Sequence, residues 1–149
     1  MLYLVDTGVL LRLFNRSDPQ HANIRLCVRN LKLSKHRLAI ATQNVAEFWN
    51  VSTRPQSARG GYGLTIEQTD RQVRILERIC EVLPDSPNLY LVWRKLVVEH
   101  KVSGVQVHDA RLVAWMETQA ITHLLTLNGA DFARYKNVVT ESPESLISR

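Results

Sequence analysis

The chain has 149 residues, of which 45% are hydrophobic and 22% are charged, and its formal net charge is +5. This length and composition are typical of one globular domain with a sizeable core, so we expect residues 1–149 to form a single domain. No apolar stretch approaches the roughly 20 residues of a membrane span. Because an acid at position 6 has no basic segment before it, we expect no signal peptide. Without a span we expect no membrane association, and the use of only two cysteines makes a cytoplasmic protein the default expectation.

Strand-like and helix-like segments alternate along the chain. The continuous apolar run at residues 2–5 is typical of a strand that is covered on both faces. Apolar runs predict further strands at residues 37–41, 81–84, 122–127 and 137–141. Apolar residues at helical spacing predict helices at residues 7–15, 21–34, 42–52, 65–81, 87–101 and 107–119.

Local signals add details to these elements. Thr42 is expected to cap the helix that starts beside it. Residues 54–64 are the one segment rich in Pro and Gly, and we expect a mobile surface loop there. The two cysteines, Cys27 and Cys80, lie in helical patterns, so we expect core thiols and neither a disulfide nor a metal pair.

Positive charge is concentrated in the first part of the chain. Residues 1–60 hold nine Lys and Arg side chains against three acids, whereas residues 61–149 hold ten against eleven. Such an excess is either a solvated helix face or a surface for a polyanion such as RNA. Charge alone does not decide between the two.

The alternation of strands and helices implies an α/β protein, with a mostly parallel central sheet between two layers of helices. Sites in such sheets form at the carboxyl ends of the strands. Asp6 follows strand 2–5 directly, and Glu47 lies in the second turn of the helix after strand 37–41. Both acids are therefore expected at this edge.

Two further acids are expected at the same edge. Asp131 comes four residues after Leu127, where strand 122–127 is predicted to end. Asp109 lies in the first turn of the helix that leads into that strand. Since such a helix runs antiparallel to the strand that it feeds, its N terminus also lies over the carboxyl edge. Each acid alone fits a helix start or a turn, but their convergence favours a functional site.

A cation is expected among these acids, because crowded carboxylates repel one another unless something neutralises them. Arg111 is near Asp109, but no Lys or Arg lies close in sequence to all four acids. Oxygen ligands without cysteine favour Mg²⁺ or Mn²⁺ over Zn²⁺. His108 is either a further ligand or a capping and packing residue. A Mg²⁺ ion held by carboxylates and waters suits the hydrolysis of phosphodiester bonds.

Four stretches carry a resemblance that spans the whole chain, and they read, in order, LVDTGVLL, TQNVAEFWNV, VHDARLVAWM and LLTLNGADFARY. Together they resemble the PIN-domain ribonucleases, in particular the VapC-type toxins of bacterial toxin–antitoxin pairs. The stretch TRPQSARGGYGL also looks like members of this toxin group. The resemblance implies a PIN-like three-layer α/β/α fold and an RNA substrate that is cut by metal-activated water. It also implies a homodimer and inhibition by a cognate antitoxin.

The resemblance also assigns residues. It implies that the metal-binding acids are Asp6, Glu47, Asp109 and Asp131. We expect Asp6 and Asp109 to ligate the ion, and the other two to complete the site directly or through waters and to orient the attacking water. Thr7 matches the hydroxyl residue after the first acid, and Thr126 and Asn128 match the polar positions before the last one. Some relatives carry an acid in place of Asn128, so the number of bound metal ions, one or two, remains open.

Other classes explain the sequence less well. A haloacid-dehalogenase-like phosphatase needs a second Asp two residues after the first, where this chain has Gly8. A receiver domain needs an acidic pair, a phosphorylatable Asp and a later Lys, and that pattern is absent. The remaining rival is an inert PIN-like module that binds RNA or a partner without cutting it. The four acids argue against this module, because RNA binding gains nothing from clustered negative charge.

Overall fold

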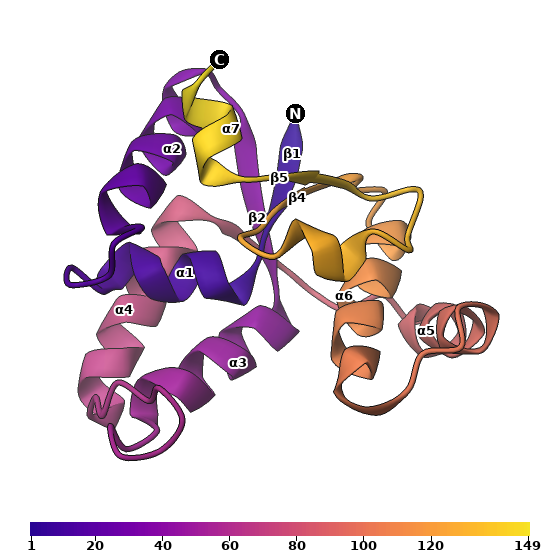
Figure 1. Ribbon diagram of the computed structural model, residues 1–149, viewed down its shortest axis with the longest axis horizontal. Coiled ribbons are helices and arrows are strands. Elements are labelled where there is room, and N and C mark those ends of the chain that lie inside the picture. Colours follow the sequence, from indigo (N-terminus) through magenta and orange to yellow (C-terminus); the bar gives the residue numbers. More distant parts are fainter.

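The computed structural model describes residues 1–149 and shows a central sheet between two layers of helices (Figure 1). The five strands are β1 (Leu2–Val5), β2 (Arg37–Ala41), β3 (Glu81–Leu83), β4 (His123–Leu125) and β5 (Val139–Glu141). The α-helices are α1 (Thr7–Phe14), α2 (His21–Leu33), α3 (Thr42–Thr53), α4 (Ile66–Ile79), α5 (Leu89–Glu99), α6 (Val107–Thr118) and α7 (Pro143–Ile147). Two short 3₁₀-helices are η1 (Gly104–Gln106) and η2 (Gly129–Phe132). The predicted three-layer α/β/α arrangement is confirmed.

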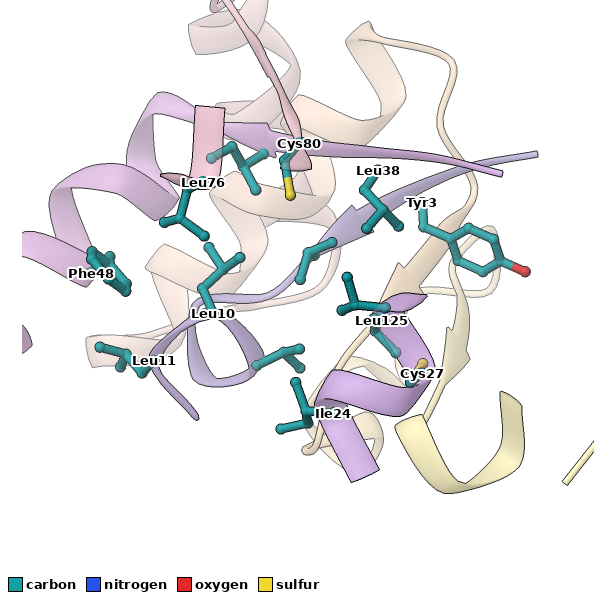
Figure 2. Close-up of a cluster of buried hydrophobic side chains, with 14 of the residues drawn as sticks. Tyr3, Leu10, Leu11, Ile24, Cys27, Leu38, Phe48, Leu76, Cys80 and Leu125 are labelled. Carbon is teal, nitrogen blue, oxygen red and sulfur yellow. The ribbon is translucent and has the colours of Figure 1, made fainter. Parts of the chain in front are cut away.

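The central strands β1, β2 and β4 are buried on both faces, which explains why they read as continuous apolar runs, whereas the edge strands β3 and β5 are partly exposed. Along β1, Tyr3 and Val5 belong to one hydrophobic cluster, whereas Leu4 between them belongs to another. The first cluster packs the sheet against α1, α2 and α4, and most of its side chains are drawn in Figure 2. The second packs the opposite face against α5 and α6, where Trp115 is completely buried. In Figure 1 these two groups of helices lie on opposite sides of the strands.

The strand order shows where a site can form. Across the sheet the order is β3-β2-β1-β4-β5, and every neighbouring pair is parallel. The chain first moves outward from β1 to β3, and it then returns through α5 and α6 to place β4 on the other side of β1. After β1 the chain continues on one face of the sheet, and after β4 it continues on the opposite face. In parallel sheets such a divergence leaves a crevice beyond the carboxyl ends of the two strands. This is the edge at which the sequence predicts the acids.

The start of α3 differs from the prediction. Thr42 is the first residue of this helix and not its cap, and its hydroxyl donates to Asp85 at 3.1 Å. Asn44 takes the capping role instead, since its Oδ1 accepts the N–H of Ala41 at 2.8 Å. Asn44 is completely buried, so this hydrogen bond fixes the junction between β2 and α3.

Residues 54–64 form a largely exposed loop, as the composition predicts, and the end of this loop is tied to α3. The N–H of Tyr62 donates to the carbonyl of Val51 at 3.0 Å, and that of Leu64 donates to Ser52 at 2.8 Å. Gly61 is buried within this segment. The loop therefore packs back onto the helix that precedes it.

The two cysteines are free and buried, as predicted. Burial raises the pKa of the Cys27 thiol to about 11 and that of Cys80 to about 12. Both thiols are therefore uncharged components of the core. Every helix of the structure is too short or too polar to cross a membrane.

Candidate functional site

Asp6 stands at the end of β1 and is fixed from both sides. Its N–H donates to the carbonyl of Leu125 at 2.9 Å, which continues the pairing of β1 with β4. Its Oδ1 accepts the N–H of Thr7 at 2.8 Å, so Asp6 caps α1. Its Oδ2 accepts the hydroxyl of Thr126 at 2.7 Å. Capping of α1 therefore uses only Oδ1 of Asp6. The other oxygen, Oδ2, is held by Thr126, which directly follows the neighbouring strand β4.

Glu47 is held in the second turn of α3 by two donors. Its Oε2 accepts the hydroxyl of Thr7 at 2.8 Å, and its Oε1 accepts Nε2 of Gln43 at 2.9 Å. The Thr7 oxygen in turn accepts Nδ2 of the buried Asn44 at 3.1 Å. Thr7 therefore joins the start of α1 to α3 and sets the orientation of the Glu47 carboxylate.

An open pocket of about 640 Å³ lies at this edge of the sheet. Six of its seven lining residues are polar or charged, and the full set is Glu47, Asn50, Val105, Gln106, His108, Asp109 and Asp131. Three of the four predicted acids therefore line one pocket. Asp6 is the fourth, and it is near enough for its charge to act on Asp109.

The acids perturb one another. Burial raises the pKa of Asp6, hydrogen bonds from Thr126 and Thr7 lower it in part, and the charges of Glu47 and Asp131 raise it further. Burial, followed by the charges of the other three acids, raises the pKa of Asp109 to about 6. Simultaneous ionisation of all four acids is therefore unfavourable in the metal-free protein. A bound cation would offset this repulsion.

No Lys or Arg forms an ion pair with any of these four acids. Arg111 lies on α6 two residues beyond Asp109, but its guanidinium pairs with Asp85 at 2.9 Å and donates to Oε1 of Gln43 at 2.7 Å. The guanidinium of Arg111 is therefore engaged by Asp85 and Gln43 and not by any of the four acids.

The donor set fits a hard divalent cation in its chemistry, because it offers carboxylate oxygens and no thiolate. No group of three or more His, Cys, Asp or Glu side chains is arranged to hold a metal ion by itself. This is compatible with Mg²⁺, which usually keeps several waters and takes only one or two protein carboxylates.

The remaining predicted residues differ in their placement. Thr7 and Thr126 are buried and contact the acids directly. Asn128 is exposed and does not line the pocket, but its N–H donates to the Thr126 hydroxyl at 3.1 Å. His108 lines the pocket and is exposed.

Sequence reasoning missed three polar residues, which are Gln43, Asn50 and Gln106. Helical spacing could have identified Gln43, because it stands one turn before Glu47 on the same side of α3. Asn50 and Gln106 had none that separates them from ordinary surface residues.

Solved structures with this fold include several toxin–antitoxin proteins. VapBC2 of Rickettsia felis, solved with a DNA fragment from its promoter, is 20% identical with a TM-score of 0.68, over 95% of this chain and 98% of that one. A toxin–antitoxin complex from Klebsiella pneumoniae is 20% identical with a TM-score of 0.63, over 93% and 96%. VapC20 of Mycobacterium tuberculosis, described as a sarcin–ricin loop cleaving toxin, is 19% identical with a TM-score of 0.64, over 91% and 95%.

These similarities are at the level of the fold. No curated protein sequence matches the chain significantly. Residues 3–138, however, match the PIN domain family. This match includes all four acids of the carboxyl edge, and it shows that the chain belongs to the PIN domain family.

Proposed function

We propose that this protein is a metal-dependent ribonuclease, acting as the toxin of a toxin–antitoxin pair, with residues 1–149 forming a single PIN domain. The observation that carries the proposal is the acidic pocket, in which Glu47, Asp109 and Asp131 line one cavity with Asp6 close by, and none of these acids forms an ion pair with Lys or Arg. Membership of the PIN domain family supports a nuclease, and the fold shared with an RNA-cleaving toxin supports RNA as the substrate.

In this proposal Asp6 and Asp109 hold Mg²⁺ or Mn²⁺. The bound ion would supply Lewis acidity and offset the charge of a phosphodiester at the pocket. The chain contributes preorganisation, because Thr126 and the Thr7 N–H already fix the two oxygens of Asp6. Such fixed ligands do not need to reorient when the ion and substrate bind.

Glu47 and Asp131 would orient the attacking water. Both oxygens of Glu47 already accept hydrogen bonds, from Thr7 and Gln43, so its carboxylate is fixed in direction while it borders the pocket. Asp131 is exposed on η2 and lines the same pocket. A water in the pocket would find carboxylate acceptors for its protons on these two side chains.

An antitoxin and a second copy of the chain are the proposed protein partners. The antitoxin is supported by the Klebsiella pneumoniae structure, which shares this fold and is itself a toxin–antitoxin complex. The homodimer follows from the family resemblance. With an RNA substrate, the proposed place of action is the cytoplasm.

Titration of Mn²⁺ into the metal-free protein, followed by calorimetry, distinguishes this proposal from an inert RNA- or partner-binding module. The nuclease predicts binding in the millimolar range or tighter, with loss of the heat in Asp109→Asn. Absence of any binding at millimolar Mn²⁺ by a folded protein would favour the inert module.

A further inference from the structure

The side chain of Gln43 bridges the two walls of the acidic pocket. Its Nε2 donates to Oε1 of Glu47 on α3 at 2.9 Å and to the backbone carbonyl of His108 on α6 at 2.9 Å. Since Asp109 follows His108 directly, one amide connects the carboxylate of Glu47 to the turn that carries Asp109. This link spans 65 residues of sequence between Gln43 and His108.

Asp85 makes a second link between α3 and α6, since its carboxylate accepts the Thr42 hydroxyl at 3.1 Å and the Arg111 guanidinium at 2.9 Å. Helix α3 packs mainly on α1 and α4, and α6 packs mainly on α5 and η1. Both side-chain hydrogen bonds that directly join α3 to α6 involve Gln43, one through its Nε2 to His108 and one through its Oε1 from Arg111. Of these links, only the Gln43 amide reaches both the Glu47 carboxylate and the turn that carries Asp109.

Arg111 determines which way that amide faces. Its guanidinium donates to Oε1 of Gln43 at 2.7 Å, and this leaves the NH₂ group directed at Glu47 and at the His108 carbonyl. Arg111 is itself anchored by Asp85 at 2.9 Å. A flipped amide would direct its oxygen at the Glu47 carboxylate and repel it, so the forked guanidinium selects the donating orientation.

We propose that Gln43 is a positioning residue that sets the separation and orientation of the Glu47 and Asp109 carboxylates, and that Arg111 acts through it. The inference rests on the proposed function, in which these carboxylates surround a divalent cation. Residues that hydrogen-bond to metal-binding carboxylates typically change metal affinity or activity by about 10- to 100-fold when they are substituted. Gln43 occupies such a position without contributing charge.

The test is the Mn²⁺ affinity, measured by calorimetry, of the full chain and its variants Gln43→Met, Arg111→Lys and the double variant. Met retains the length of Gln without its hydrogen bonds, and Lys retains the charge of Arg without the fork that reaches two partners. We expect Gln43→Met to weaken Mn²⁺ binding roughly tenfold. Arg111→Lys should also weaken it, and the double variant should bind no more weakly than Gln43→Met alone, because Arg111 acts through the amide.

Gln68→Met is the matched control. It removes a comparable hydrogen bond, from the N–H of Thr65 to Oε1 of Gln68 at 2.9 Å, at the start of α4 and outside this network. Its Mn²⁺ affinity should equal that of the wild type. The free energy of unfolding in EDTA, measured for both Met variants, separates positioning from stability, since a merely structural role of Gln43 would change stability and leave the affinity alone.

Each outcome bears on a different claim. Wild-type affinity in Gln43→Met, in a protein whose binding still requires Asp109, would overturn this inference and leave the proposed function standing. Losses that multiply in the double variant would overturn the role of Arg111 through Gln43. A wild-type protein that binds no Mn²⁺ would overturn the proposed function together with the inference.

Discussion

The hydroxyl of Thr126 donates a hydrogen bond of 2.7 Å to Oδ2 of Asp6, although 120 positions separate the two residues in the chain. The bond forms because β1 and β4 are neighbours in the sheet, with Val5 in register with Leu125. The buried hydroxyl thus reaches the acid from the adjacent strand end. The first carboxylate of the site is therefore oriented by the fold itself.

Thr126→Val should weaken the site without changing the size of the side chain. It removes the hydrogen bond to Asp6, and it leaves the N–H of Asn128 without its acceptor. We expect the free energy of unfolding to fall by about 1–2 kcal/mol, and Mn²⁺ affinity to fall because Asp6 is less well oriented. Chemical denaturation and calorimetry measure the two effects.

The control for this change is Thr118→Val, which removes a hydroxyl bonded at 2.8 Å to the carbonyl of Trp115, at the end of α6. It should leave Mn²⁺ affinity unchanged. Equal affinity in the Thr126 and Thr118 variants would contradict a role of Thr126 at the site.

Asp109→Asn should stabilise the metal-free protein at neutral pH. Burial and the neighbouring acids raise the pKa of Asp109 from 3.8 to about 6. The unfolded chain therefore ionises first as the pH rises, and stability is lost progressively between these two values. A shift of this size corresponds to about 3 kcal/mol, which we reduce to about 1 kcal/mol because the side chain is partly exposed.

Denaturation in EDTA at several pH values measures this effect. The stability of the wild type should fall from pH 4 to pH 6 more steeply than that of Asp109→Asn, and the two curves should converge at acid pH. With Mn²⁺ the order should reverse, since only the wild type gains stability from binding. A variant that is less stable than the wild type in EDTA at pH 7 would show that the charge of Asp109 does not destabilise the folded protein.

Gly61→Ala should destabilise the segment 54–64. A Cβ at this position would meet the backbone carbonyls of Arg54 and Pro55, which are not free to move aside. Overpacking of this kind typically costs about 1–3 kcal/mol. Gly8→Ala is the control, because its Cβ would lie 3.4 Å from the flexible end of Arg12, within a helix that favours Ala. Thermal unfolding that is unchanged in Gly61→Ala would contradict the close packing of this segment.

The sequence predicts the elements well where a local pattern determines them. The strand at β1 and the helices α2 and α6 follow from apolar runs and helical spacing, and Asp6 and Asp109 lie where this pattern predicts them. The polar contacts of the site are different in kind. The bonds from Thr126 to Asp6 and from Gln43 to His108 join segments that are distant in sequence, so no local signal specifies them.

The same distinction explains the corrected details. Thr is a residue type that commonly caps helices, but the hydroxyl of Thr42 donates to Asp85, which lies in the segment after β3. Arg111 is near Asp109 in sequence, yet the fold directs it to the same Asp85. The short helix α7 was not predicted, because its five residues are too few to establish a helical period.

Cleavage of RNA by the purified chain tests the central claim most directly. The assay compares the wild type with Asp6→Asn, a variant that can still cap α1, on a panel that includes structured RNAs such as tRNA, in Mg²⁺, Mn²⁺ or EDTA. The account predicts cleavage by the wild type with either metal, none in EDTA, and a loss of at least about a hundredfold in Asp6→Asn. Cleavage that persists in EDTA, or that is unchanged in a folded Asp6→Asn protein, would contradict a metal-dependent nuclease built on these four acids.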